Sequence, residues 1–223
     1  MCNPAGIQFG QTHLSPDEVK NRKVLEVGST NVNGSLRESV EALKPSTYLG
    51  VDIALGRGVD EICDVTDLVA RYGKESFDVV ITTEMFEHVR PWKKAISNLK
   101  NVLRPGGILI FTTRSLGFGY HGYPFDFWRY EIDDMNAIFA DLQIEKLEKD
   151  SSAPGVFVRA RKPLRFVEAN LEDHELYSMI TRRRCRDISD SRILLFKMKR
   201  TLSPFIPEPL KKIVKRISGI HSC

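Results

Sequence analysis

Two histidines stand among residue types that could support acid–base chemistry. His88 closes the run EMFEH at residues 84–88, in which two carboxylates precede the imidazole. His121 lies in residues 117–130, a stretch rich in glycine and aromatic side chains. An imidazole titrates near neutral pH and can take a proton from a hydroxyl group. Each histidine is therefore a candidate catalytic base, and the competing interpretation is a structural role in a loop or at a helix end.

The same acidic run offers a second chemistry. Carboxylate oxygens and imidazole nitrogens are both common metal ligands. A divalent ion could be held by a set of four such side chains, namely Glu84, Glu87, His88 and His121. We predict that no metal is bound, and we keep a metal site as the alternative.

The stretch around His121 also has the composition of an acceptor pocket. Its aromatic faces could hold a sugar ring or a flat molecule, and they would favour a neighbouring cation. The candidate acceptor-binding residues are Tyr120, Tyr123, Asp126, Trp128 and Arg129. The alternative is an aromatic minicore that anchors a helix starting near Glu131, with Asp126 and Arg129 as a structural ion pair.

Short apolar runs that alternate with helical patterns must position these side chains. Helices are predicted to begin near Ser15, Gly34 and Pro91, and strands are predicted over residues 24–28, 48–52, 77–82 and 108–113. Such alternation is typical of a parallel sheet covered on both faces. Two further strands, 142–147 and 156–161, are joined by a loop instead of a helix, so this closing pair is predicted to be antiparallel. The fold class is α/β.

Ligands of such sheets bind at the carboxyl ends of the strands. There the first strand ends in Gly28 and the second ends in Asp52. A glycine lets the backbone approach a ligand, and a carboxylate can accept both hydroxyls of a ribose. The loop after Gly28 lacks the further glycines that a pyrophosphate needs, which favours a nucleoside over a dinucleotide. The alternative is that Gly28 forms only a tight turn and Asp52 caps a helix.

These ordered motifs resemble those of the class I S-adenosylmethionine-dependent methyltransferases over roughly residues 20–162. Glu26 and Gly28 match the start of the family's glycine-rich loop, whereas Thr30 and Val32 replace its later glycines. The segments EMFEHV and LRPGGILIFTT also match, and HGYPFDFWRYE is similar to segments of bacterial glycan and natural-product methyltransferases. The resemblance implies a Rossmann-like, mostly parallel sheet with a closing antiparallel strand pair.

The resemblance also implies S-adenosylmethionine as the cofactor. Glu26 and Gly28 would face its methionine part, Asp52 its ribose and Asp64 its adenine. The implied cofactor site consists of Glu26, Gly28, Ser29, Asn31, Asp52, Ile53, Cys63, Asp64, Val65 and Glu84. The EMFEH run is further similar to metal-binding segments of small-RNA 2′-O-methyltransferases and quinone-biosynthesis O-methyltransferases, although metal-free members of the family contain such segments too.

The composition of the 223-residue chain excludes several other classes of protein. Hydrophobic residues (42%) and charged residues (28%) have ordinary globular proportions, which excludes wholesale disorder. The four cysteines stand far apart, which argues against a disulfide framework or a zinc finger. No apolar run has the length of a membrane span, and the first residues lack a signal-peptide pattern. We expect a cytoplasmic protein.

The net charge of +4 is unevenly distributed. Residues 163–223 have 13 Lys or Arg against 7 Asp or Glu, whereas residues 1–162 have 20 against 22. We predict a methyltransferase-like domain over 1–162 and a basic helical extension over 163–223, with no further strand. The extension has apolar stripes among lysines, most clearly Leu210, Ile213, Val214 and Ile217. It could pack on the domain, or contact a membrane surface or another protein; nucleic acid is not the expected partner.

Together these features predict an enzyme that transfers a methyl group from S-adenosylmethionine to a small-molecule or glycan acceptor at oxygen. One alternative is an RNA methyltransferase that uses a metal ion and the basic extension. Another is a non-catalytic cofactor-binding scaffold, which the altered glycine loop favours.

Overall fold

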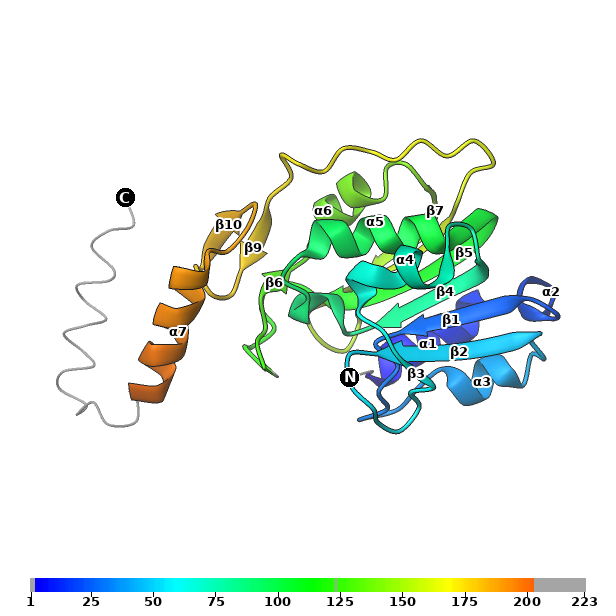
Figure 1. Cartoon of the computed structure of the whole chain (residues 1–223), viewed down its shortest axis with the longest axis horizontal. Coiled ribbons are helices and arrows are strands. Elements are labelled where there is room, and N and C mark those ends of the chain that lie inside the picture. The colour runs from blue at the N-terminus through cyan, green and yellow to red at the C-terminus, as the bar shows by residue number, and fades with distance from the viewer. Residues whose placement is uncertain (1–2, 123, 203–223) are drawn as a thin grey trace. The chain divides into compact units, whose positions relative to one another are not determined.

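The structure is a computed structural model that describes residues 3–122 and 124–202 (Figure 1). The chain divides after Asp187 into two compact units, and each is described by itself. The first unit contains the sheet and both candidate histidines. The division falls later than the boundary near 162 that the charge distribution suggested, so residues 163–187 belong to the first unit.

The first unit is built on a seven-stranded sheet with the strand order β3-β2-β1-β4-β5-β8-β7. The strands are β1 (Lys23–Val27), β2 (Thr47–Asp52), β3 (Glu61–Ile62), β4 (Phe77–Thr83), β5 (Leu103–Arg114), β7 (Gln143–Lys149) and β8 (Gly155–Arg161). The first five are parallel, whereas β8 is antiparallel to both β5 and β7. The predicted α/β class and the antiparallel closing pair are confirmed.

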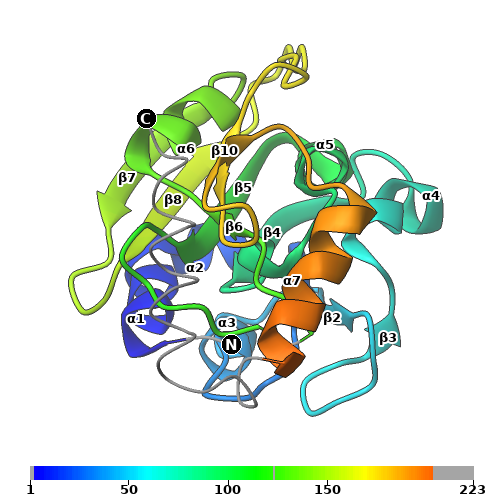
Figure 2. The same cartoon turned by 90° about the vertical axis from the view of Figure 1, so that its left-hand side faces the viewer.

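Helices cover both faces of this sheet (Figure 2). They are α1 (Pro4–His13), α2 (Pro16–Val19), α3 (Arg37–Glu41), α4 (Leu68–Tyr72), α5 (Trp92–Val102) and α6 (Ile132–Ile138), with short 3₁₀ turns η1 (Val65–Asp67) and η2 (Phe86–His88). Phe9 of α1, Val19 of α2 and Val40 of α3 are buried in one core cluster with sheet residues. The central strand β4 is apolar and buried on both sides, as expected for a parallel strand between two helical layers.

A second, three-stranded sheet has the order β10-β9-β6 and consists of β6 (Trp128–Arg129), β9 (Leu176–Ser178) and β10 (Arg183–Cys185). The prediction that no strand follows residue 163 was wrong. Strands of two or three residues are too short to show the alternation of apolar and polar residues by which strands are recognised. Part of the positive charge that follows residue 162 is paired within this unit, because Arg184 pairs with Asp134 and Arg186 with Asp173.

The described part of the second unit contains one helix, α7 (Asp190–Leu202). The predicted stripe of Leu210, Ile213, Val214 and Ile217 lies outside the described residues, as does Tyr123. Within the ranges 3–122 and 124–202, we find no helix with the length and apolar character needed to cross a bilayer.

Candidate active site

The carboxyl end of β1 carries the expected glycine turn. Gly28 has a φ of +77°, a conformation that L side chains rarely adopt, and its amide donates to the carbonyl oxygen of Val51 at 2.9 Å. A Cβ at this position would lie 2.6 Å from the Met85 side chain. Gly28 is thus required both by its backbone conformation and by the close approach of the segment after β4.

The loop after Gly28 tolerates side chains because a facing loop supplies the glycines. The Asn31 amide donates to the Arg57 carbonyl oxygen at 2.8 Å, which joins the two loops. A Cβ on Gly56 would lie 3.2 Å from Thr30, and one on Gly58 would lie 2.8 Å from the Ser29 carbonyl oxygen. The loop after β2 thus has glycines, Gly56 and Gly58, where it meets the loop after β1.

Asp52 lies at the junction of these loops. Its carboxylate accepts hydrogen bonds from the amides of Thr30, at 3.1 Å, and Ile53, at 2.7 Å. The Ile53 side chain is 65% exposed, which is unusual for a large apolar residue beside a strand end. A carboxylate next to an uncovered apolar surface fits a ribose and a base, so the residues present are compatible with a nucleoside cofactor.

The other predicted cofactor residues divide into two groups. Cys63 donates its amide to the Asp52 carbonyl oxygen at 2.9 Å, and the exposed Asp64 caps η1 by accepting from the Thr66 amide at 2.8 Å. Both therefore stay near Asp52. Only Asp64 of these residues is exposed, because Cys63, Ser29 and Val65 are buried at 8%, 2% and 5% exposure and offer little side-chain surface to a ligand.

Glu26 is buried on β1 and accepts a hydrogen bond from the Tyr48 hydroxyl at 2.8 Å. Burial raises the pKa of Glu26 to about 7, although the Tyr48 hydrogen bond and the nearby Arg37 charge oppose the shift. Near neutral pH this carboxyl is therefore divided between its protonated and ionised forms. A positive charge placed close to it would favour the ionised form.

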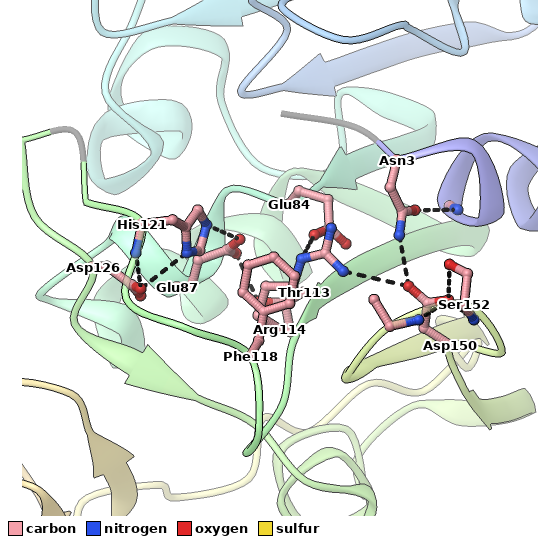
Figure 3. A network of polar contacts seen from close by, with 12 residues as sticks. Asn3, Glu84, Glu87, Thr113, Arg114, Phe118, His121, Asp126, Asp150 and Ser152 are labelled. Atoms are coloured by element: carbon pink, nitrogen blue, oxygen red, sulfur yellow. Dashed lines mark hydrogen bonds and ion pairs between the residues drawn. The ribbon is translucent and has the colours of Figure 1, made fainter.

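The end of β4 turns the chain through an unusual conformation at Glu84. Glu84 has a φ of +53°, and it is buried in an ion pair between its Oε2 and Nε of Arg114 (Figure 3). Nη1 of Arg114 also lies 3.4 Å from the Asp150 carboxylate, and this carboxylate accepts a hydrogen bond from the side-chain amide of Asn3 at 2.6 Å. Burial and the neighbouring Glu87 raise the pKa of Glu84, whereas the Arg114 charge opposes this shift. This chain of contacts fastens the start of α1 to the strand ends.

Glu87 lies between the two candidate histidines. Its Oε1 is 3.5 Å from Nε2 of His121 and 3.9 Å from Nε2 of His88, and its Oε2 accepts from the Thr113 hydroxyl at 2.8 Å. The side chain is fully buried. Although burial disfavours its charge, the two histidines hold the pKa of Glu87 below the ordinary value. Residues far apart in the sequence thus meet at one carboxylate.

His121 is held as a cation. Its Nδ1 is 3.0 Å from the Asp126 carboxylate and its Nε2 faces Glu87, so both ring nitrogens face groups that only accept hydrogen bonds (Figure 3). Burial opposes protonation, but the hydrogen bonds to Asp126 and Glu87 outweigh it and raise the pKa of His121 to about 9. At neutral pH this ring is therefore an imidazolium ion and has no free lone pair to take a proton.

His88 also faces an acceptor on each side, but one of the two lies beyond hydrogen-bond distance. Its Nδ1 lies 2.7 Å from the carbonyl oxygen of Phe125, which can only accept, so Nδ1 carries the hydrogen. In the neutral ring the lone pair is then on Nε2, the atom that faces Glu87. The two histidine rings pack edge to face with centroids 4.8 Å apart. Of the four nitrogens in the two rings, Nε2 of His88 is the one that lies farthest from the acceptor it faces, at 3.9 Å from Glu87.

The predicted acceptor residues do not all line a cavity. Asp126 and Arg129 are both fully buried and form a two-point ion pair, with Nη2 of Arg129 2.6 Å from Oδ2 of Asp126. Trp128 is fully buried and donates from its indole nitrogen to the Val89 carbonyl oxygen at 3.0 Å. The structure therefore gives these three residues supporting positions, as in the alternative of a structural minicore. Tyr120 is partly exposed.

A cavity of about 330 Å³ opens at the ends of β4 and β5. Its lining is formed by Asn3, Pro4, Asn33, Glu84, Arg114, Phe118 and His121. The Phe118 ring stacks on the Arg114 guanidinium at 4.1 Å, so an aromatic surface and a charged one form adjacent walls. Such a cavity can admit a small molecule and can place its polar groups beside the His121 imidazolium.

A metal ion is compatible with part of the predicted set. One ligand atom each of Glu87, His88 and His121 lie within 4.8 Å of one another. Glu84 is engaged with Arg114 and does not join this group. Because His121 is protonated at neutral pH, a metal would have to displace its proton before the ring could act as a ligand.

Arg114 lines the cavity, although the sequence patterns did not single it out. It directly follows the apolar run ILIFTT of β5, and a charged residue at the carboxyl end of a central strand is a positional signal for the site. Its partners could not be inferred, because Glu84, Phe118 and Asp150 come from three different elements.

Comparisons with known proteins agree with this fold. A family model described as a methyltransferase domain matches residues 8–184, nearly the whole first unit. Ubiquinone biosynthesis O-methyltransferases are similar, with 32% identity over 124 residues in Idiomarina loihiensis (50% of this chain, 49% of the relative) and 29% over 124 residues in Chromobacterium violaceum (50% and 51%). The chain therefore spans about half the length of the curated relatives it matches.

Solved structures show the same fold. An S-adenosylmethionine-dependent methyltransferase from Mesorhizobium loti superposes with a TM-score of 0.56 at 15% identity, covering 72% of this chain and 99% of the other. The 1,6-didemethyltoxoflavin N1-methyltransferase of Burkholderia thailandensis gives a TM-score of 0.56 at 13% identity, covering 72% and 80%. The chain belongs to the methyltransferase-domain family. Its fold is that of the class I S-adenosylmethionine-dependent methyltransferases, as the resemblance in sequence indicated.

Proposed function

We propose that this chain transfers a methyl group from S-adenosylmethionine to an oxygen atom of a small-molecule acceptor. The observation that carries the proposal is the convergence of His88 and His121 on the buried Glu87 beside the cavity. The array lies at the carboxyl ends of β4 and β5, next to the strands whose loops would hold the cofactor.

The cofactor would be held at the β1 and β2 ends. Asp52 would accept from the ribose hydroxyls, Ile53 would cover the base, and Glu26 would balance the positive charge of the methionine part. When bound, S-adenosylmethionine supplies a methyl carbon to which the acceptor oxygen bonds as the carbon–sulfur bond breaks. The protein's own contribution is to align the acceptor oxygen with that carbon and to remove the hydroxyl proton.

Two histidines in the site would divide this work. The His121 imidazolium lines the cavity and would stabilise negative charge on the acceptor oxygen as the proton leaves. His88 would take the proton at Nε2, and its new positive charge would be balanced by Glu87 at 3.9 Å. Asp126 keeps His121 oriented and charged, while Arg129 fixes Asp126. The aromatic wall at Phe118 would favour a flat acceptor.

The named relatives support oxygen as the acceptor atom, since they are O-methyltransferases of ubiquinone biosynthesis. They favour neither an RNA acceptor nor a non-catalytic scaffold. A cavity of about 330 Å³ also has the size of a site for a small molecule more than for a glycan chain.

The test combines binding and turnover. Calorimetric titration with S-adenosylhomocysteine should show binding, and incubation with S-adenosylmethionine and a panel of small phenols and hydroxy acids should yield a methylated product. His88→Ala should bind the cofactor normally but lower kcat by about 10²- to 10⁴-fold. His13→Gln is the matched control, because His13 lies at the end of α1. Unchanged kcat in His88→Ala would remove the assigned base, and absence of cofactor binding would remove the function.

A further inference from the structure

Helix α7 presents an apolar stripe to solvent. Leu194, Leu195 and Met198 are 59%, 50% and 51% exposed. At about 100° per residue, these three positions lie within one arc of roughly 100° on the helix surface. Side chains of this size are seldom left uncovered together in a soluble protein, so the stripe needs a partner.

Basic residues border this stripe on both sides. Going round the helix, Lys197 lies beyond one edge, while Lys199 and Arg192 lie beyond the other. All three are exposed, and Arg200 is exposed on the remaining face, with its guanidinium 5.9 Å from the Phe196 ring. With Asp190 as its one acidic residue, α7 has four basic side chains against one acidic.

We infer that α7 binds an anionic lipid surface, lying flat with Leu194, Leu195 and Met198 inserted among the acyl chains. Flexible basic side chains on both borders can keep their charges at the phosphate level while their stems cover apolar surface. A helix of 13 residues spans about 20 Å, which suits an in-plane orientation and is too short for crossing a bilayer. The sequence beyond α7 repeats the combination of apolar and basic residues.

The charge on α7 favours lipid over the other possible occupants. A second copy of the chain would bring two helices of equal positive charge together, which opposes pairing at the stripe. In sequence, the residues 203–223 add further positive charge, with Lys211, Lys212, Lys215 and Arg216 against Glu208. An anionic lipid surface can bury the apolar stripe and at the same time pair with the basic residues that border it. This inference does not depend on the proposed methyl transfer.

The experiment is co-sedimentation of the full chain with vesicles. Binding should be strong with vesicles containing about one third phosphatidylglycerol and weak with pure phosphatidylcholine, and it should fall as NaCl is raised from about 0.1 M to about 0.5 M. Leu195→Asp should weaken partition to the anionic vesicles by about tenfold or more, since it replaces an inserted apolar side chain by a charge. Lys197→Ser combined with Lys199→Ser should weaken it by several-fold.

The matched control is Val167→Asp, because Val167 is 83% exposed but lies in the first unit. This variant should bind vesicles like the parent chain. Equal binding of Leu195→Asp and the parent would overturn the inference. So would a parent chain that ignores anionic vesicles while Leu195→Asp converts a dimer to a monomer in light scattering, since a second copy would then be the occupant. Folding of each variant is checked by circular dichroism and by S-adenosylhomocysteine affinity.

Discussion

The ends of β1 and β2 are constructed differently from the ends of β4 and β5. At the first pair, the site is shaped mainly by backbone, through the turn at Gly28 and the two joined loops around Thr30 and Gly56. At the second pair, it is shaped by charged side chains, with a buried carboxylate, Glu87, between two imidazoles. Both pairs of strand ends belong to one sheet and lie side by side in it.

This difference separates two tasks. A cofactor that is the same in every turnover can be recognised by a fixed loop shape and one carboxylate. Proton removal requires groups whose charge can change, and these have to be kept out of water and close together. We therefore expect substitutions at the β4 and β5 ends to affect turnover, and those at the β1 and β2 ends to affect cofactor affinity.

Replacing the shared carboxylate should have the largest effect. Glu87→Gln removes the charge that faces both histidines, so kcat should fall by about 10²- to 10⁴-fold. Cofactor affinity should stay within about twofold of the parent, because Glu87 follows β4 whereas Asp52 ends β2, and β1 lies between these strands. Steady-state kinetics and calorimetry measure the two quantities. His174→Gln, which alters a histidine paired with Asp134 outside the cavity, is the control. A variant that loses affinity and keeps kcat would reverse the division of tasks.

The complementary substitution is Asp52→Asn, which keeps the size of the side chain and removes its charge. S-adenosylhomocysteine affinity should fall by about 10- to 100-fold, since hydrogen bonds to a charged group contribute about 1.5–3 kcal/mol each. At saturating cofactor, kcat should change little. Calorimetric titration measures the loss. An affinity equal to that of the parent would show that this carboxylate does not touch the cofactor.

The charged side chains at the ends of β4 and β5 should also make the free energy of unfolding depend on pH. The pKa of His121 rises from 6.5 to about 9 on folding, so its stabilising contribution is complete below 6.5 and is lost as the pH rises through 9. Between these limits the free energy of unfolding of the parent should fall by about 2 kcal/mol more than that of His121→Gln. Urea denaturation at several pH values measures the difference. Parallel pH profiles of the two proteins would contradict the buried imidazolium.

The smallest expected effect is the release of a proton at the ends of β1 and β2 when the cofactor binds. Glu26 has a pKa of about 7, so near pH 7 the ammonium group of a bound cofactor should expel up to about half a proton. Titrations with S-adenosylhomocysteine in phosphate and in Tris buffers should give different heats. In Glu26→Gln the two heats should coincide. Equal heats in the parent would place the cofactor's charge away from Glu26.

Much of the fold could be predicted from the sequence because its signals are local. The buried strand at 77–82 and the proline-initiated helix α5 are recognisable from neighbouring residues alone. The glycine and the carboxylate at the ends of β1 and β2 are likewise recognisable from the residues that close each strand. The separate sheet of β6, β9 and β10 was missed, since its pairing joins residues almost fifty positions apart through very short strands.

For the ends of β4 and β5, the sequence predicted candidate residues but not how these residues are arranged. His88 and His121 were indistinguishable in the sequence, because their difference depends on which acceptors face each nitrogen. Glu87 meets the Thr113 hydroxyl across 26 positions, and no local pattern encodes that contact. Trp128 was expected in the pocket on the basis of its chemistry, yet its indole is used to fasten the chain to Val89.

The joined loops after β1 and β2 imply a constraint on evolution. Where the loops cross, a Cβ on Gly56 would lie 3.2 Å from the Thr30 side chain, which is tighter than an ordinary van der Waals contact. A glycine at position 30 should make alanine at position 56 acceptable, whereas alanine at 56 beside Thr30 should be selected against. Across relatives, the two positions should therefore vary as a pair, and a search that looks for the glycines in one loop only will overlook members that have moved them to the other.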